Sequence, residues 1–302
     1  MSMNPQPTTV AASSVSAPRP RAVSAADLRQ PLQGTVHVLE RPDGTQLHVV
    51  VDGNGPQSVL LEHGFSMSAD VWSLVQRELV ARGLRVIAYD RRAHGRSTCG
   101  RDGLTSAALR ADLKAVAETF DVNQAVLVCH SMGNFVALGA LEDATFRSRF
   151  RYGVLVNPVT GHSAKGSPVV LFQAPLLALG VVQCLVRIPS VGRKFARMNL
   201  GGAASDAVVE ATRLTLAEVS TKFSPVLKML RRESVESVLA RIDLPLHVFT
   251  SNEDRTTPAW HAELIVARAP RAKIDYVAGA GHMLPWEAPD EIVQAVLAGL
   301  PA

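Results

Sequence analysis

The segment Ala125–Asn134 constrains the fold of this chain more than any other stretch. It begins with four apolar residues, continues with a polar tripeptide that ends at Ser131 and reaches a glycine at Gly133. This pattern predicts a buried strand, a very tight turn and then a helix. A serine at such a turn is pushed out of the sheet, and the next residue, Met132, offers its backbone N–H at the helix N-terminus. The segment therefore predicts a nucleophile and half of an oxyanion site.

Eight short segments have the pattern of strands. The first two alternate along their length and flank a turn signal, as expected for an antiparallel hairpin. The other six are largely apolar, which is typical of a parallel sheet buried on both faces. The expected strands are Val36–Glu40, Gln46–Val51, Val59–Glu62, Val86–Asp90, Ala125–Cys129, Gly153–Asn157, Leu246–Thr250 and Ile274–Ala278.

Helical patterns separate these strands, with apolar residues recurring at the helical period. An alternation of strands and helices after an initial hairpin predicts an α/β fold, in which helices flank a mostly parallel sheet. The expected helices of this part are Ser68–Ala81, Ser106–Phe120, Met132–Leu141, Ala259–Ala267 and Pro289–Leu297.

The alternation stops between residues 158 and 241, where the patterns are helical only, over Val169–Ile188, Ser205–Glu218 and a last set within 222–241. A helical insertion that starts at the C-terminal end of a strand is well placed to cover a site there. Residues 1–25 are rich in Ser, Ala, Pro and Thr without an apolar core, so they predict a disordered tail and not a secretory signal. We therefore expect a core of residues 26–157 and 242–302 and a helical cap at 158–241.

Composition and charge exclude several classes of protein. The 302 residues are 47% hydrophobic and 19% charged, as in a globular chain. The net charge of +4 is spread out, and even the densest basic spots, such as Arg91–Arg92, lack interleaved aromatic residues, so we expect no nucleic-acid partner. Three cysteines lie far apart, which indicates neither a disulfide framework nor a metal site and favours a reducing cytoplasm.

One apolar segment approaches the length of a membrane span. Pro168–Arg187 nearly reaches the roughly 20 residues that a bilayer requires. Gln173, Pro175 and Gln183 interrupt it, however. We expect a buried or substrate-facing pair of helices there and no membrane span.

A serine hydroxyl needs a base within hydrogen-bond reach, and the base needs an orienting acid. Among nine histidines, His282 stands out because it directly follows the last predicted strand. Asp254 follows the preceding strand in the same way. The C-terminal ends of parallel strands meet at one edge of a sheet, so Ser131, Asp254 and His282 are expected to come together in that chain order.

The second oxyanion donor should come from an earlier loop. His63-Gly64-Phe65 follows the strand Val59–Glu62, and the glycine permits a close backbone approach. The Phe65 N–H is therefore expected beside the Met132 N–H, and loss of one such donor typically costs about 3–4 kcal/mol of transition-state stabilisation.

Taken together, the motifs of the chain resemble those of the α/β-hydrolase superfamily. His63-Gly64, Asp90–Ser97, Cys129–Gly133, Asp254 with Pro258, and Gly281-His282 stand in the order of that family's landmarks. The likeness runs from about Val36 to Leu300, with the insertion in the place of the variable cap. The resemblance implies an eight-stranded sheet with its second strand antiparallel. It also implies Ser131 as nucleophile, His282 as base, Asp254 as its partner and an oxyanion hole formed by Phe65 and Met132.

The sequence departs from the family at Cys129, where glycine is usual. Cysteine is small, so we expect the turn to form with the thiol in the core, and a chemical role for the thiol remains the weaker alternative. His130 and His94 are expected to have structural roles. Asp90 should bind backbone N–H groups of its loop, and Glu253 is a weaker candidate for the acid than its neighbour Asp254.

The expected reaction is hydrolysis of a carboxylic ester or lactone through an acyl-enzyme on Ser131, without a metal or organic cofactor. The insertion is rich in Leu, Val and Ala, which favours a small hydrophobic substrate as partner. The same three side chains could also serve carbon–carbon bond cleavage in a diketone, perhydrolysis, elimination or lyase chemistry. A ligand receptor on this fold is a further alternative. The sequence leaves the oligomeric state open.

Overall fold

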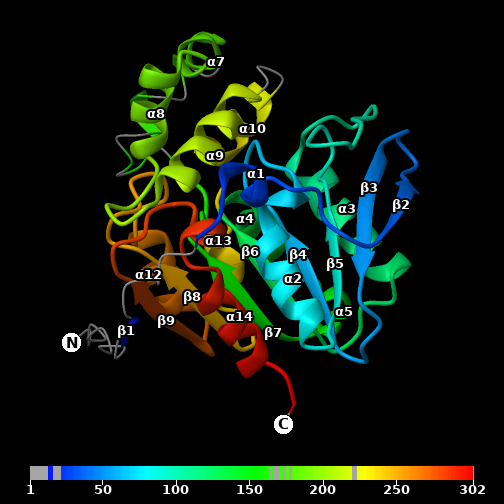
Figure 1. The fold of residues 1–302 in the computed structure, drawn as a ribbon. Helices are drawn as coiled ribbons and strands as arrows, with labels where there is room; N and C mark the ends of the chain where they lie inside the picture. The colour runs from blue at the N-terminus through cyan, green and yellow to red at the C-terminus, as the bar shows by residue number, and fades with distance from the viewer. Residues whose placement is uncertain are drawn as a thin grey trace, which may run out of the picture.

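The computed structural model describes residues 22–163, 165, 167, 170–172, 175–176, 179–219 and 223–301, together with the backbone of residues 13–15. Its described strands form one nine-stranded sheet in the order β1-β9-β8-β7-β6-β4-β5-β3-β2 (Figure 1). The strands are β1 (Ser13–Val15), β2 (Thr35–Glu40), β3 (Gln46–Asp52), β4 (Ser58–Glu62), β5 (Arg85–Tyr89), β6 (Ala125–His130), β7 (Phe150–Val156), β8 (Leu246–Thr250) and β9 (Ala272–Val277).

The directions of the strands confirm the expected fold class. Strand β3 runs antiparallel to both of its neighbours, β2 and β5, and every other described pair in the sheet is parallel. All eight predicted strands are present with ends within a few residues of the prediction. Strand β1 is an addition that the sequence did not predict, and it pairs with the edge strand β9.

Helices cover both faces of this sheet. Figure 1 shows α2 and α14 against the face turned toward the viewer, and α3 and α12 behind the sheet. The described helices outside the insertion are α1 (Ala25–Leu28), the 3₁₀ helix η1 (Ala69–Trp72), α2 (Ser73–Ala81), α3 (Ser106–Thr119), α4 (Met132–Ala140), α5 (Ala144–Arg147), α12 (Trp260–Arg268), α13 (Leu284–Glu287) and α14 (Pro289–Ala298).

Alternate residues of each central strand point into different cores. Leu60 and Leu127 belong to the apolar cluster that contains α3, α4 and α12, whereas Val59 and Val126 belong to the cluster with α2 and α14. All four side chains are fully buried. Burial on both faces explains why these strands have continuous apolar sequences.

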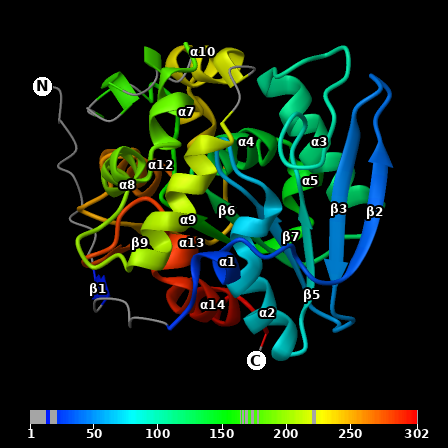
Figure 2. The same cartoon turned by 45° about the horizontal axis from the view of Figure 1, so that its top comes forward.

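The described residues of the insertion form helices at one end of the sheet, α7 (Val181–Val186), α8 (Pro189–Arg197), α9 (Asp206–Ala217), α10 (Ser224–Arg232) and α11 (Glu236–Leu239). Figures 1 and 2 show α7 to α10 gathered above the sheet. Within the helical segment expected at Val169–Ile188, Gly180 adopts a left-handed conformation with φ 75° just before α7. Part of that expected segment lies outside the described residues.

The tail expected at residues 1–25 lies mostly outside the described residues. Within it, Ser13–Val15 form β1, and Ser24 caps α1 through a reciprocal hydrogen-bond pair with Asp27. Among the residues that the structure describes, no helix is both long and apolar enough to cross a membrane.

Arg91 and Arg92, the first of the basic spots in the sequence, are buried rather than part of a basic surface. Arg91 pairs with Glu62 at 2.9 Å, and Arg92 pairs with Asp112 at 2.6 Å and with Asp43 at 2.9 Å. Buried arginines require such partners, because an unpaired charge in the interior is strongly unfavourable.

Candidate active site

Ser131 occupies a strained turn between β6 and α4. Its φ of 52° and ψ of −121° lie in a region that side-chain-bearing residues rarely adopt. The backbone supports this geometry, since the Ser131 N–H donates to Val156 O at 2.9 Å and the Ser131 carbonyl accepts the Asn134 N–H at 3.0 Å. The predicted strand, turn and helix are thus present, and the turn lifts the serine side chain above the sheet edge.

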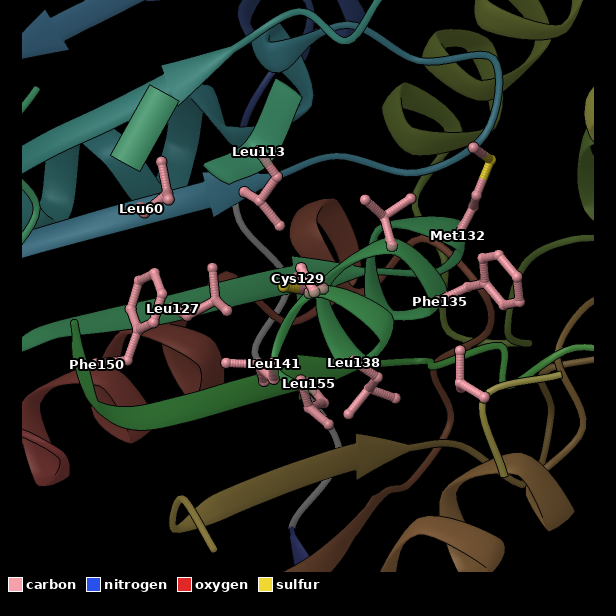
Figure 3. Packing of buried hydrophobic residues seen from close by; sticks show 14 of the residues in the cluster. Leu60, Leu113, Leu127, Cys129, Met132, Phe135, Leu138, Leu141, Phe150 and Leu155 are labelled. Atoms are coloured by element: carbon pink, nitrogen blue, oxygen red, sulfur yellow. The ribbon is translucent and has the colours of Figure 1, made fainter. Parts of the chain in front are cut away.

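The residues two positions before and after Ser131 are packed tightly. A Cβ on Gly133 would lie 2.8 Å from the carbonyl oxygens of both Glu62 and His63, so only glycine fits there. Cys129 lies in the apolar core under α4, beside Leu138 and Leu155 (Figure 3). Burial raises the pKa of the Cys129 thiol well above its usual value. The cysteine is therefore an inert core residue and not a nucleophile.

The structure brings together the three distant side chains that the sequence singled out. His282 Nε2 lies 3.0 Å from Ser131 Oγ, and His282 Nδ1 lies 2.8 Å from Asp254 Oδ2. Since a carboxylate can only accept, Nδ1 carries the proton of the neutral ring and Nε2 offers a lone pair to the serine hydroxyl. All three residues are buried, and Ser131 and His282 line a cavity.

Asp254 is fixed by its own loop. Its Oδ1 accepts the backbone N–H groups of Thr256 and Thr257, both at 2.8 Å, and its Oδ2 lies 2.7 Å from Thr257 Oγ1. Burial opposes ionisation of this carboxyl, but attraction to His282 and these hydrogen bonds outweigh burial and lower its pKa. Asp254 is therefore a carboxylate at neutral pH.

Two side chains, Asn157 and His130, hold the backbone around His282. Asn157 Nδ2 donates to the carbonyls of Gly281, at 2.7 Å, and of His282, at 3.0 Å. His130 Nε2 donates to the same His282 carbonyl at 2.8 Å. Burial and the neighbouring His282 lower the pKa of His130 to about 3, so this ring is neutral. His130 thus has the structural role expected from the sequence.

A buried carboxyl group, Glu287, clamps the same loop to the insertion. Its Oε2 accepts the N–H groups of Gly281 at 2.9 Å and of Gly201 at 3.0 Å, and its Oε1 accepts that of Met283 at 3.0 Å. The three donors favour the ionised form, yet burial prevails and raises the pKa of Glu287 to about 7.

The two expected oxyanion donors lie beside Ser131. Gly64 approaches so closely that a Cβ on it would lie 3.2 Å from the Ser131 Cβ, and Phe65 lines the same cavity as Ser131 and His282. Met132 is the first residue of α4. Within the described part of the chain, neither the Phe65 nor the Met132 amide has a hydrogen-bond acceptor, so both donors are available.

The remaining candidates have structural partners. Asp90 accepts the N–H groups of Ala69 at 2.7 Å and Arg96 at 2.8 Å, which confirms its expected role in the loop. Glu253 accepts the Gly202 N–H at 2.7 Å, and within the described part of the chain the carboxylate bonded to His282 is that of Asp254. His94 stacks on Phe223 of the insertion at 4.3 Å.

The cavity above Ser131 has a volume of about 120 Å³ and a largely apolar lining. Core residues Phe65 and Met67 meet side chains of the insertion there, among them Val170, Leu216, Val219 and Leu227. A second, more polar pocket of about 390 Å³ shares Ser66, Met67 and Thr215 with the first. The site is thus an apolar cavity beside a polar one, both partly formed by residues 158–241.

This arrangement can activate an alcohol and stabilise an oxyanion, which are the two requirements of acyl transfer. Among the described residues, no group of three or more His, Cys, Asp or Glu side chains could hold a metal ion.

Sequence reasoning did not identify Thr257, Asn157, Asn199 or Glu287. Thr257 had a signal, because it stands three residues after Asp254, at the spacing of a local side-chain to backbone turn. Asn157 and Asn199 contact the His282 loop from 125 and 83 positions away in the chain, and no local pattern marks such contacts.

Residues 59–295 match the model of the alpha/beta hydrolase family. The match covers most of the chain and includes Ser131, Asp254 and His282. The chain belongs to the alpha/beta hydrolase family.

Several known proteins are similar to the chain. A non-heme chloroperoxidase of Burkholderia pyrrocinia is 36% identical over 123 residues, which span 38% of this chain and less than half, 44%, of that relative. A 2-hydroxy-6-oxononadienedioate/2-hydroxy-6-oxononatrienedioate hydrolase of Burkholderia vietnamiensis is 26% identical over 289 residues, 87% of this chain and 93% of the relative. An esterase from Exiguobacterium antarcticum has a TM-score of 0.75 at 19% identity, over 88% of this chain and 98% of that one, and at this identity it shows the fold alone.

Proposed function

We propose that the protein is a serine hydrolase that cleaves a carboxylic ester or lactone of a small hydrophobic substrate. The observation that carries the proposal is the continuous hydrogen-bonded series from Ser131 Oγ through His282 to Asp254, with distances of 3.0 and 2.8 Å. The family supports the class of enzyme. A cytoplasmic location, inferred from the cysteine pattern, is part of the same proposal.

The proposed reaction has two halves. Ser131 Oγ attacks the carbonyl carbon while His282 Nε2 takes the hydroxyl proton, and the N–H groups of Phe65 and Met132 bind the oxyanion. The charged imidazole is stabilised by the Asp254 carboxylate and returns the proton to the leaving alcohol. A water molecule, deprotonated by His282, then attacks the acyl-serine and releases the acid. Asp254 keeps the imidazole in the required tautomer throughout.

The walls of the cavity support the proposed substrate class. Its lining is apolar, so it favours an acyl chain over a charged group. We propose that residues 158–241 act as the cap of this cavity, because Val170, Leu216, Val219 and Leu227 come from that segment. Short charged esters should therefore be poor substrates.

Esters, thioesters and lactones of graded chain length test this function against the wild type, Ser131→Ala and His282→Ala. We expect the highest kcat/KM for uncharged chains of medium length and a loss of about 10³-fold or more in both variants. A fluorophosphonate should label the wild type but not Ser131→Ala. Equal activity of the wild type and both variants would refute the proposal.

Perhydrolysis is a second candidate, favoured by a relative from Acinetobacter calcoaceticus named as a bifunctional esterase/perhydrolase, which is 40% identical over 75 residues, 25% of this chain and 27% of the relative. In that case hydrogen peroxide replaces water in the second half, so that the acyl-serine is released as a peracid and Ser131 regains its proton through His282. Peracid formation from an ester and peroxide, measured against hydrolysis in the same sample, distinguishes the two. Carbon–carbon bond cleavage, suggested by the name of the Burkholderia vietnamiensis relative, is tested by a diketone in the same panel.

A further inference from the structure

We propose that Arg91 is a positioning residue for the reaction: its guanidinium holds the Gly64 carbonyl and thereby aims the Phe65 N–H at the oxyanion. This inference rests on the proposed function. It is carried by the hydrogen bonds of a buried side chain, none of which reaches Ser131 or His282 in the described structure.

The Arg91 guanidinium forms hydrogen bonds with the turn that follows β4. Its Nη1 donates to Glu62 Oε1 at 2.9 Å and to the His63 carbonyl at 2.5 Å, and its Nη2 donates to the Gly64 carbonyl at 2.5 Å. The side chain is fully buried. An arginine is suited to this task, because its planar fork holds several acceptors in fixed directions, whereas a lysine ammonium acts as a point charge.

The neighbouring His63 adds a second donor to the same Gly64 carbonyl. The Arg91 backbone N–H donates to His63 Nε2 at 3.0 Å, so Nε2 carries no proton. Burial and the charge of Arg91 hold the pKa of His63 well below its usual value, so the ring is neutral and its proton is on Nδ1. His63 Nδ1 lies 2.8 Å from the Gly64 carbonyl and donates to it. Two donors therefore fix this oxygen in place.

Peptide geometry transmits this constraint to Phe65. In a trans peptide the carbonyl oxygen of one residue and the N–H of the next point in opposite directions, and the described chain contains no cis peptide bond. Anchoring the Gly64 oxygen toward Arg91 therefore turns the Phe65 N–H away from Arg91. Gly64 abuts Ser131, and Phe65 lines the cavity, so that direction leads toward the reacting carbonyl.

Arg91 also polarises the peptide that supplies the donor. A hydrogen bond from a charged group is about twice as strong as a neutral one, and it draws electron density toward the carbonyl oxygen. The N–H at the other end of the same peptide becomes a stronger donor. Glu62 balances the charge of the guanidinium, so the site presents a directed dipole instead of an uncompensated cation.

Two variants of Arg91 test the inference. Arg91→Lys keeps a cation for Glu62 but cannot hold both carbonyls, and the double variant Glu62→Met with Arg91→Met removes the ion pair without leaving an unpaired charge. In both we expect kcat for an activated ester to fall by about 10- to 100-fold with KM within threefold, and the Ki of a boronic acid that mimics the tetrahedral adduct to rise by a similar factor.

Arg92→Lys is the matched control. Arg92 is also a buried, paired arginine, but it contacts Asp112 and Asp43 and not the His63–Phe65 turn. We expect the Arg92→Lys variant to lose thermal stability as Arg91→Lys does, while its kcat stays within twofold of the wild type. A kcat for Arg91→Lys as high as that of Arg92→Lys, or a change confined to KM, would overturn the inference.

A measurement on the wild type does not depend on the folding of any variant. When the boronic acid binds, the amide protons of both Phe65 and Met132 should move downfield in the proton–nitrogen NMR spectrum. A shift of the Met132 amide proton without a shift of the Phe65 amide proton would overturn this inference but leave the proposed function standing. If the wild type has no Ser131-dependent turnover, the proposed function fails and this inference fails with it.

Discussion

The carbonyl oxygen of Asn199 accepts the backbone N–H of His282 at 2.8 Å. Asn199 lies between α8 and α9, so a segment of the insertion pairs directly with the loop that carries the proposed base. The Ala203 N–H donates to Gly279 O at 3.2 Å, and Glu287 bonds to Gly201 and Gly281 together. The insertion therefore does more than cover the cavity, because it also fixes the loop around His282.

This contact predicts a large effect of Gly281→Ala. A Cβ on Gly281 would lie 2.3 Å from the backbone of Leu200 and Gly201, so the two segments must separate. Misplacement of a reacting group by about 1 Å can cost about 100-fold in rate, and we expect a loss of kcat of that order for an activated ester. Gly202→Ala is the control, because its Cβ would make only an ordinary contact with Glu253 at 3.5 Å. Equal kcat values for the two variants would contradict the prediction.

Glu287 predicts an unusual dependence of stability on pH. Its folded pKa of about 7 lies above the ordinary value of 4.5, so its contribution is fully present below pH 4.5 and is lost as the pH rises through 7. The free energy of unfolding of the wild type relative to Glu287→Gln should therefore fall by about 3 kcal/mol between pH 4.5 and 8. Urea unfolding across this range provides the measurement. A rise over the same interval would mean that the three N–H donors keep the carboxyl ionised.

The cysteines should differ in their reaction with a thiol reagent. Cys99 and Cys184 are exposed, whereas Cys129 is buried and its thiol has a raised pKa. Ellman's reagent should therefore titrate two thiols quickly in the native protein and the third only after unfolding. Cys129→Ala should keep its ester hydrolysis within about threefold of the wild type, since the thiol takes no part in the proposed reaction. Rapid modification of Cys129 with loss of activity would support the rejected role in chemistry.

The ring contacts of Phe223 are expected to stabilise the packing of the insertion against the core. Its ring stacks on His94 at 4.3 Å and meets Phe65 edge-on at 5.5 Å. Removal of a buried phenylalanine costs about 3–5 kcal/mol, so Phe223→Ala should lower the free energy of unfolding by about that amount. Phe172→Ala is the control, because that ring is 54% exposed and its loss should cost less than 1 kcal/mol. A smaller loss for Phe223→Ala than for Phe172→Ala would contradict this account.

The sequence predicts the central sheet well for a physical reason. Strands such as β4 and β6 are buried on both faces, so their apolar sequences need no knowledge of their neighbours. The meeting of Ser131, Asp254 and His282 was also predictable, because each follows a parallel strand and these strands end at one edge. Strand β1 was not predictable, since Ser13–Val15 becomes a strand only through its pairing with β9.

Other features depend on partners that are far away in the chain. No local pattern marks Arg91 and Arg92 as buried, because the acceptors that hold their side chains in the interior lie 20 to 49 positions away in the chain. Glu287 likewise has no local pattern that would reveal three backbone donors. In the insertion, the sequence predicted a pair of helices but did not place the break at Gly180, where a left-handed residue precedes α7.

The pairing of Asn199 with His282 also bears on protein engineering. Strands β7 and β8 are neighbours in the sheet. A chimera in which the whole segment between them is replaced by the corresponding segment of another enzyme would therefore keep the sheet intact. Such a transplant would nevertheless remove the carbonyl at Asn199 and the N–H at Gly201 that anchor the histidine loop. Designers who want new selectivity should keep Asn199–Gly201 in the recipient and graft only the helices on either side.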